Sequence, residues 1–227
     1  MKNLSIFIFL FIILGIHAQT TNPINNVKNN KIKIAIIPGF SDFDFSSLNK
    51  SLQANGLPKV NDGLQYTTMA SVSFPIVGMQ WDVTGGISRS EDQTNGFDLN
   101  QRSVFLEYGM QLFKYKKNNH HVFFNVAFGL TSSQVDIYEN QNAVNFADAL
   151  NGFEGAISLD SGNNSYIALK TGYDWHIKPE GRFLLGFRLG YRIGLDKQQW
   201  SVNGQTLNDS PESSANGLYF GVSISFQ

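Results

Sequence analysis

The stretch that decides the fold is RFLLGFRLGYRIGL, residues 182–195, near the end of the chain. Every second residue in it is large and apolar, and the residues between are mostly glycine or arginine. Strict alternation predicts a β-strand whose two faces differ in chemistry. In a soluble protein the polar face would meet water, where nothing requires so many glycines. Which face meets solvent therefore decides what kind of protein this is.

The composition narrows the class of protein. The chain has 227 residues, enough for one domain, of which only 15% are charged and 13% are aromatic. Its formal net charge is −1, so bulk charge gives no support for a nucleic-acid partner. The sequence contains no cysteine, which excludes a disulfide framework, a cysteine zinc site and lipid attachment to an N-terminal cysteine.

The first 18 residues are typical of a cleavable signal peptide. One lysine precedes an apolar run over residues 4–16, and Ala18 is the expected cleavage position. The run is shorter than the roughly 20 residues that a membrane-spanning helix needs. Residues 19–30 are polar and rich in asparagine, and we expect them to form a flexible lead before the folded domain.

Eight segments carry alternating patterns and are predicted to be β-strands. They cover residues 31–45, 64–76, 77–90, 102–115, 121–137, 165–177, 182–195 and 217–226. The connections after the second, fourth and sixth segments are short, whereas those at 46–63, 91–101, 138–164 and 196–216 are long. The first long connection predicts a short helix with Ser46 or Ser47 as N-cap and Gly56 as its stop. Eight antiparallel strands of this kind predict an up-and-down barrel, because closure leaves no unpaired edge.

Two kinds of barrel compete at this point. A soluble ligand-binding barrel is apolar inside, whereas a transmembrane barrel is apolar outside. An eight-stranded barrel has an interior only just wide enough for side chains, so large apolar residues from every strand would overfill it. The face that carries the glycines fits inside, and water would penalise an apolar belt as large as the opposite face. The sequence favours the transmembrane barrel, and the soluble barrel stays as the alternative.

Three aromatic residues fit the same interpretation. Trp81 and Trp175 fall on the apolar face near the short-turn end, and Tyr66 falls on it near the long-loop end. Tryptophan and tyrosine gather where a membrane meets water. We therefore expect these three residues to be lipid-interface aromatics, with ordinary core packing as the alternative.

The polar face would bring charges into the lumen, and buried charges need partners. We expect an internal ion-pair network centred on Arg188 and Arg192, with the glycines leaving room for their side chains. The full predicted set is Asp82, Glu107, Lys170, Asp174, Arg188 and Arg192, with the three acidic residues as acceptors. Such a network plugs the barrel, because eight strands leave no open lumen. A gated ion path is the alternative.

Little in the sequence points to catalysis. Three histidines, His120, His121 and His176, fall at the short-turn end, and neither a Ser-His-Asp order nor metal-ligand spacing accompanies them. We therefore expect no catalytic residue, metal or cofactor. The long loops are acidic without calcium-loop spacing. The connection 138–164 has no lysine or arginine, and it is the best candidate for a recognition surface because long loops on rigid scaffolds tend to carry function.

The chain resembles the small outer-membrane β-barrels of Gram-negative bacteria, the OmpA/OmpX-like group. The resemblance covers nearly all of the chain after the signal peptide, by architecture. Its most specific part is YFGVSISF, residues 219–226, where Tyr219, Gly221, Ile224 and Phe226 are similar to the assembly signal of such proteins. Gln227 after the terminal aromatic is a small departure from that pattern. The asparagine-rich composition resembles Bacteroidetes sequences.

The resemblance implies a location, a role and partners. Residues 1–18 would be the signal peptide, 19–30 a periplasmic lead and 31–227 an eight-stranded barrel in the cell outer membrane, with short periplasmic turns and long extracellular loops. The implied role is structural or one of surface interaction: envelope integrity, adhesion or binding. Implied partners are outer-membrane lipid, lipopolysaccharide, the barrel-assembly machinery and an extracellular ligand bound at the loops. The implied oligomeric state is a monomer. A narrow ion or small-solute channel and a small barrel enzyme are the alternatives.

Overall fold

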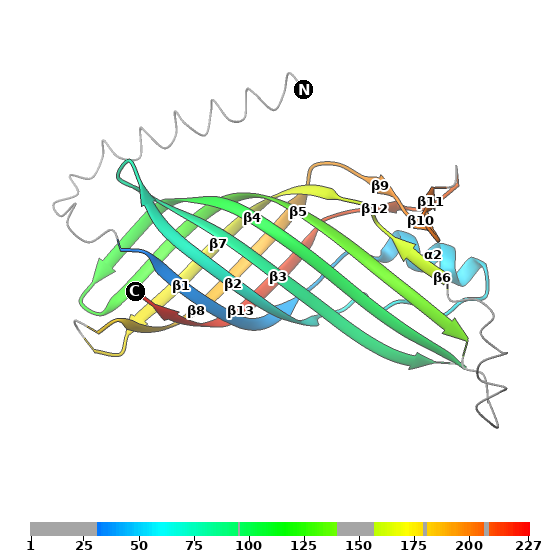
Figure 1. Cartoon of the computed structure of the whole chain (residues 1–227), viewed down its shortest axis with the longest axis horizontal. Coiled ribbons are helices and arrows are strands. Elements are labelled where there is room, and N and C mark those ends of the chain that lie inside the picture. The colour runs from blue at the N-terminus through cyan, green and yellow to red at the C-terminus, as the bar shows by residue number, and fades with distance from the viewer. Residues whose placement is uncertain (1–30, 95, 140–156, 179–180, 207–208) are drawn as a thin grey trace, which may run out of the picture.

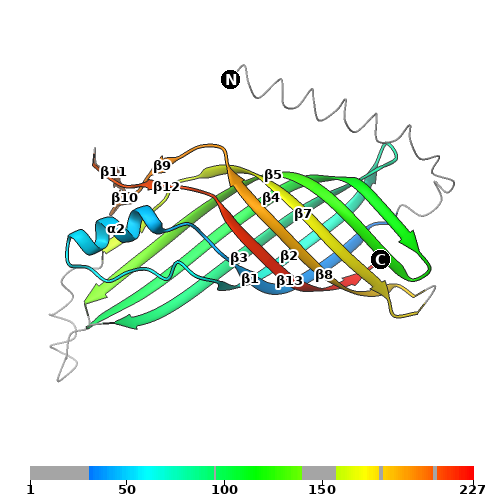
Figure 2. The ribbon, with the colours of Figure 1, turned by 180° about the vertical axis from the view of Figure 1, so that it is seen from behind.

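The structure is a computed structural model that describes residues 31–94, 96–139, 157–178, 181–206 and 209–227. The predicted signal peptide and lead, and most of the connection 138–164, lie outside the described residues. Within the described part, eight long strands form a closed antiparallel ring (Figures 1 and 2). In ring order they are β1 (Lys33–Ser41), β2 (Gln65–Ile76), β3 (Met79–Thr94), β4 (Phe97–Lys117), β5 (His120–Glu139), β7 (Asn164–His176), β8 (Phe183–Gly194) and β13 (Gly217–Phe226). Pairing of β13 with β1 closes the ring, and the predicted fold class is confirmed.

Small elements gather at the long-loop end, on the right in Figure 1. They are helix α2 (Ser46–Ala54) and the short strands β6 (Ile157–Asp160), β9 (Gln198–Gln199), β10 (Ser201–Val202), β11 (Gln205–Thr206) and β12 (Glu212–Ser213). β6 extends the sheet beside β5, and β10 and β11 continue it outward. Two of the predicted long connections therefore contain strands of their own.

Helix α2 lies where the sequence predicts it, but its N-cap differs. The N-cap residue is Phe45, without a side-chain capping bond. The preceding Asp44 takes that part instead, since its carboxylate accepts hydrogen bonds from the Ser46 backbone N–H at 3.1 Å and the Ser46 hydroxyl at 2.6 Å. The prediction of Ser46 or Ser47 as N-cap is wrong because a carboxylate two residues earlier reaches the same donors. Gly56 has a φ of +74° just past the helix, as expected for a stop residue.

The prediction of a long loop over residues 91–101 is wrong. β3 continues to Thr94 and β4 starts at Phe97, so the two strands form one long hairpin with Glu91 paired to Asn100. β4 has 21 residues and β5 has 20, about twice the 9–11 residues that a tilted strand needs to cross a bilayer. Polar residues interrupt the alternation here because this part of the hairpin projects into water, where a strand face need not be apolar.

The outer surface of the ring carries a continuous apolar belt, as the sequence predicts. On β8 the side chains of Phe187, Leu189 and Tyr191 are exposed, whereas Arg192 between the last of them and Ile193 is fully buried. The same alternation holds around the ring. The exposed apolar residues of the belt include Ile34, Ile36, Phe40, Val72, Ile87, Val104, Leu106, Tyr108, Val122, Phe128, Leu130, Leu169, Tyr173, Leu185, Ile193, Leu218, Val222 and Ile224. This is the reverse of a soluble ligand-binding barrel.

The two faces exchange character along β4 and β5. In the belt, Val104 and Leu130 point outward and Glu107 points inward. Beyond the belt, the outward positions are polar, at Asn100, Arg102, Gln134 and Asp136, and the inward positions Leu99, Val135 and Ile137 are buried and apolar. The outer end of the barrel is thus built like a soluble protein, and the inversion places the edge of the apolar belt beside Val104 and Leu130.

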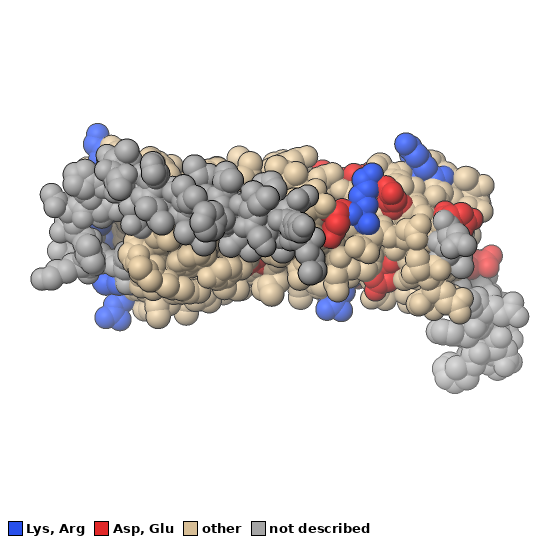
Figure 3. All heavy atoms as spheres, turned by 90° about the horizontal axis from the view of Figure 1, so that it is seen from above, with Lys and Arg blue, Asp and Glu red and all other residues tan. Residues whose placement is uncertain are grey.

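The inward apolar residues of that outer end belong to a core that continues into the lumen as far as Phe105, Tyr166 and Tyr219. The part of this core around α2 is here called the cap, and it includes Phe45, Leu48, Leu52, Val60 and Trp200. The rings of Phe45 and Trp200 lie 6.0 Å apart. Partial burial raises the pKa of the nearby Asp42 carboxyl above its usual value, since desolvation disfavours the charged form. Figure 3 shows most acidic side chains of the visible face over this half of the molecule. No helix in the described ranges is long and apolar enough to cross a membrane.

Candidate functional site

Glycine positions in the lumen accommodate aromatic rings. In four directly paired cross-strand positions, a glycine faces an inward aromatic residue: Gly86–Phe105, Gly129–Tyr166, Gly172–Phe123 and Gly190–Tyr219. A Cβ atom at any of these glycines would stand less than 3.0 Å from the ring, closer than real Cβ atoms come. The expectation that the glycines make room for arginine side chains is therefore wrong at these positions. The rings fill that space, and arginines stack on them, Arg188 on Phe123 and Arg192 on the other three.

Arg192 lies among three of these rings, those of Phe105, Tyr166 and Tyr219, and is fully buried. Its guanidinium carbon lies 4.2 Å from the ring centre of Phe105 and 4.7 Å from that of Tyr219, with Phe43 and Tyr166 at 5.0 and 5.6 Å. Cation–π attraction of this kind strengthens when water is excluded. Its Nε lies 3.6 Å from Oε1 of Glu107. We call these residues the arginine layer: Arg192, Glu107, Phe43, Phe105, Tyr166 and Tyr219.

Glu107 joins the arginine layer to the polar half of the lumen. It accepts hydrogen bonds from the Tyr166 hydroxyl at 3.0 Å and the Tyr219 hydroxyl at 3.4 Å. Lys170 lies 3.2 Å from its second oxygen and 2.5 Å from Asp82, which also accepts a hydrogen bond from the Asn125 amide at 2.8 Å. Each buried charge in this chain of contacts has an opposite charge beside it, but the guanidinium nitrogens of Arg192 make no hydrogen bond with any described residue, and that side chain depends on the charge of Glu107 and on the surrounding rings.

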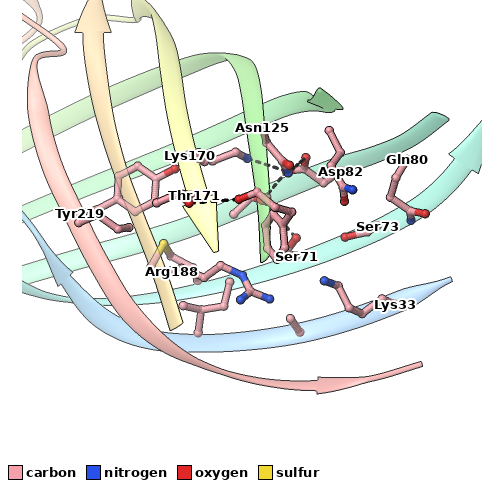
Figure 4. Close-up of a pocket in the computed structure, with 17 residues that line it drawn as sticks. Lys33, Ser71, Ser73, Gln80, Asp82, Asn125, Lys170, Thr171, Arg188 and Tyr219 are labelled. Atoms are coloured by element: carbon pink, nitrogen blue, oxygen red, sulfur yellow. Dashed lines mark hydrogen bonds and ion pairs between the residues drawn. The ribbon is translucent and has the colours of Figure 1, made fainter. Parts of the chain in front are cut away.

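A second cluster lies nearer the short-turn end, and Figure 4 labels its two cations, Lys33 and Arg188. The carboxylate of Asp174 pairs with Arg188 at 2.7 Å and with Lys33 at 2.9 Å. The Arg188 guanidinium and the Lys33 ammonium also stack on the Phe123 ring, at 4.7 and 4.9 Å from its centre. Two cations thus share one acid, and this cluster carries a net positive charge.

All six residues predicted for the lumen network face inward in the structure. The geometry brings together Arg188 with Asp174 and Arg192 with Glu107. Asp82, expected to accept from an arginine, instead pairs with Lys170, because the register sets Lys170 against Asn125 beside it.

Sequence reasoning missed Lys33. Its signal was present, since Lys33, Ala35 and Ile37 alternate with the exposed Ile34 and Ile36, but the irregular pattern around Pro38 obscured it.

The other predicted residues lie as follows. Tyr66 and Trp175 are exposed on the outer surface at opposite ends of the belt, and Trp81 stacks on Tyr108 with ring centres 5.2 Å apart. On the last strand, Ile224 and Phe226 face outward, whereas Tyr219 and Gly221 face the lumen. Tyr219 therefore belongs to the arginine layer, and a role of these four residues in assembly stays a prediction.

Between the arginine layer and the short-turn end the lumen is partly open. A cavity of about 40 Å³ is lined by polar groups that include Ser71, Ser73, Thr84 and Lys170 (Figure 4). A second, of about 30 Å³, lies at the short-turn mouth and shares Lys33 and other lining residues with the first. The larger cavity has room for about three waters. The described residues include no group of three or more side chains suited to a metal ion.

Comparisons with known proteins identify the fold. The sequence matches no protein-family model and no curated protein. Among solved structures it is similar to a major outer membrane protein from Thermus thermophilus, with a TM-score of 0.50 and 10% identity over 86% of this chain and 100% of that one. Neisserial surface protein A (TM-score 0.47, 10% identity, 86% and 94% covered) and Ail of Yersinia pestis (0.41, 11%, 87% and 99%) are also similar.

At such low identity the likeness to the Thermus protein shows the fold alone. That fold is the eight-stranded barrel of small outer-membrane proteins, as predicted from the sequence.

Proposed function

We propose that this chain is an integral barrel of the cell outer membrane with a structural or surface-interaction role and a plugged lumen. The observation that carries the proposal is the inversion of faces along β4 and β5, apolar outside within the belt and polar outside beyond it. A water-soluble barrel gains nothing from such a change, whereas a barrel that emerges from lipid into water requires it. Outer-membrane lipid and lipopolysaccharide cover the belt, and the barrel-assembly machinery inserts it.

The lumen supports a plug more strongly than a channel. The arginine layer fills the cross-section with four aromatic rings around a fully buried guanidinium. An ion crossing this level would have to displace rings that contact the opposite glycines. The cap continues the same apolar core beyond this layer, toward the long-loop end. The barrel is therefore closed at its long-loop end.

The cap and the projecting hairpin are the parts offered to the exterior. They place acidic and polar side chains on a rigid support, where binding residues are often found. The proposal assigns them adhesion, binding or envelope integrity through surface contact, by a monomer, and assigns no catalytic activity.

Two measurements test the proposal. The expressed protein should sediment with the outer membrane and migrate faster in gel electrophoresis before heating than after it, as folded barrels do. A soluble, heat-insensitive protein would refute the membrane assignment. The purified barrel in a planar lipid bilayer should show no discrete conductance steps. Reproducible single-channel steps would refute the plug and favour the narrow channel, while leaving the membrane assignment intact.

A further inference from the structure

The short-turn mouth contains lysines that the strand pattern alone would send outward. The register of β4 against β5 shifts between Gln111 and Phe113, and such bulges re-aim side chains at the rims of barrels. After the shift, Lys114 pairs with Phe123 and Lys116 pairs with His121. Phe123 and His121 are both buried inward residues. The bulge therefore turns Lys114 and Lys116 toward the mouth. They share the inner face of β4 with Glu107, which lies further from the short-turn end.

The mouth carries an excess of positive charge. Its lining includes Lys31, Lys33 and Lys114 against one acidic side chain, that of Asp174, and it also includes the last residue, Gln227, whose backbone carboxylate adds one negative charge. Asp174 is already shared between Lys33 and Arg188. In the described part of the chain, Lys114 forms no ion pair. At least two cationic charges at this end are therefore left without a protein counter-charge among the described residues.

A buried histidine also lacks a partner there. His121 is more than nine-tenths buried and lines the mouth, and its Nε2 makes no hydrogen bond with any described residue. Its ring meets that of His176 edge to face, with ring centres 4.7 Å apart. Buried polar atoms left without a partner are uncommon and call for a ligand or water. The open nitrogen and the unpaired ammonium groups belong to one cavity.

We propose that the short-turn mouth is a blind binding site for a phosphate group, held by Lys33, Lys114 and His121. Ammonium groups and an imidazole N–H are donors suited to a phosphate oxyanion. A metal cation at the same histidines would be repelled by the surrounding lysines, and the described residues offer no third ligand. The arginine layer closes the lumen above, so the phosphate binds and leaves on the same side.

The phosphate comes either from a soluble phosphate ester or inorganic phosphate, or from a phospholipid headgroup of the facing leaflet. The site lies at the end opposite the cap, so it is independent of the surface role. It needs only a folded barrel with an accessible mouth. Failure of phosphate binding would therefore leave the membrane and conductance tests unaffected, whereas single-channel conductance would overturn only the statement that the site is blind, which rests on the proposed plug.

The test is calorimetric titration of inorganic phosphate into the refolded barrel in a phosphate-free maltoside detergent, with chloride at matched ionic strength as the reference. We expect saturable binding at one site. Lys114→Gln should weaken it by roughly tenfold or more, because it removes one positive charge beside a charged ligand, and His121→Leu should do the same, because it removes one hydrogen-bond donor. The matched control is Lys117→Gln, since Lys117 is exposed and pairs with His120 on the outward face; this variant should bind as the unmodified protein does.

Two results would overturn the proposal: no saturable heat with phosphate, or equal affinity in the Lys114 and Lys117 variants. Heat-dependent gel mobility verifies that each variant is folded. Addition of short-chain phosphatidylglycerol distinguishes the two sources, because competition with inorganic phosphate identifies the headgroup as the ligand. If phosphatidylglycerol does not compete, the site takes soluble phosphate.

Discussion

Replacing Arg192 by methionine removes the cation from an ion pair whose two side chains are both fully buried. Methionine keeps much of the volume between the rings of Phe105 and Tyr219, so the loss is mainly one of charge. Glu107 is then left with Lys170 at 3.2 Å, but Lys170 also serves Asp82. The lumen would hold one uncompensated negative charge.

Breaking a buried pair by removing one partner typically costs about 3–5 kcal/mol. Since Lys170 still lies beside Glu107, we expect the lower end, about 3 kcal/mol of unfolding free energy, for Arg192→Met. Glu107→Gln should cost about the same, because it leaves the guanidinium with aromatic partners only. In the double variant neither charge remains, and Lys170 keeps Asp82. Its cost should be about 3 kcal/mol in total, well short of the sum of the two single changes.

Equilibrium unfolding in urea, followed by tryptophan fluorescence in lipid vesicles, measures these free energies. Arg188→Leu is the comparison, because Asp174 keeps Lys33 at 2.9 Å; we expect a smaller loss, about 1–2 kcal/mol. Additive single-variant costs within about 0.5 kcal/mol would show that Arg192 and Glu107 do not act as a pair. A loss below about 1 kcal/mol for Arg192→Met would refute the plug as a source of stability.

Two further predictions concern packing and depth. Gly86→Ala should lower the unfolding free energy by about 1–3 kcal/mol, because its methyl group would overlap the Phe105 ring. Gly85→Ala is the control, because that position has ordinary van der Waals surroundings, and it should change the unfolding free energy by less than about 0.5 kcal/mol in the same urea titration. Equal effects of the two substitutions would contradict the glycine–aromatic packing. In single-tryptophan variants, lipids brominated near the headgroup should quench the emission of Trp175 but not that of Trp200, which lies in the cap. Equal quenching of the two residues would show that the position assigned to the apolar belt is wrong.

The outer half of the barrel shows how one strand serves two solvents. Within the belt, β4 and β5 turn apolar side chains outward, and a few residues further they turn them inward to the cap. Because side chains alternate with a period of two, this change needs no break in the strand, only an exchange of residue types between the two faces. The same rule explains why the projecting hairpin resembles a loop in its composition.

Much of the fold follows from local pattern. The last strand, β13, has the predicted bounds 217–226, and β8 differs from its prediction by one residue at each end. The choice of inside and outside also followed from the sequence, because an eight-stranded lumen has too little room for the large apolar face. These properties depend on residue type and period, which a sequence displays directly.

Tertiary structure alone decided which residues meet. The pairing of Gly190 with Tyr219, the bulge that redirects Lys114, and the partner of Asp82 all depend on the register between strands distant in the chain. Register is set jointly by ring closure and by packing across the lumen, so a change in one pair moves every other. The sequence therefore determined a barrel with a charged interior, and only the closed ring determined that Arg192 lies in an aromatic layer above a cationic mouth.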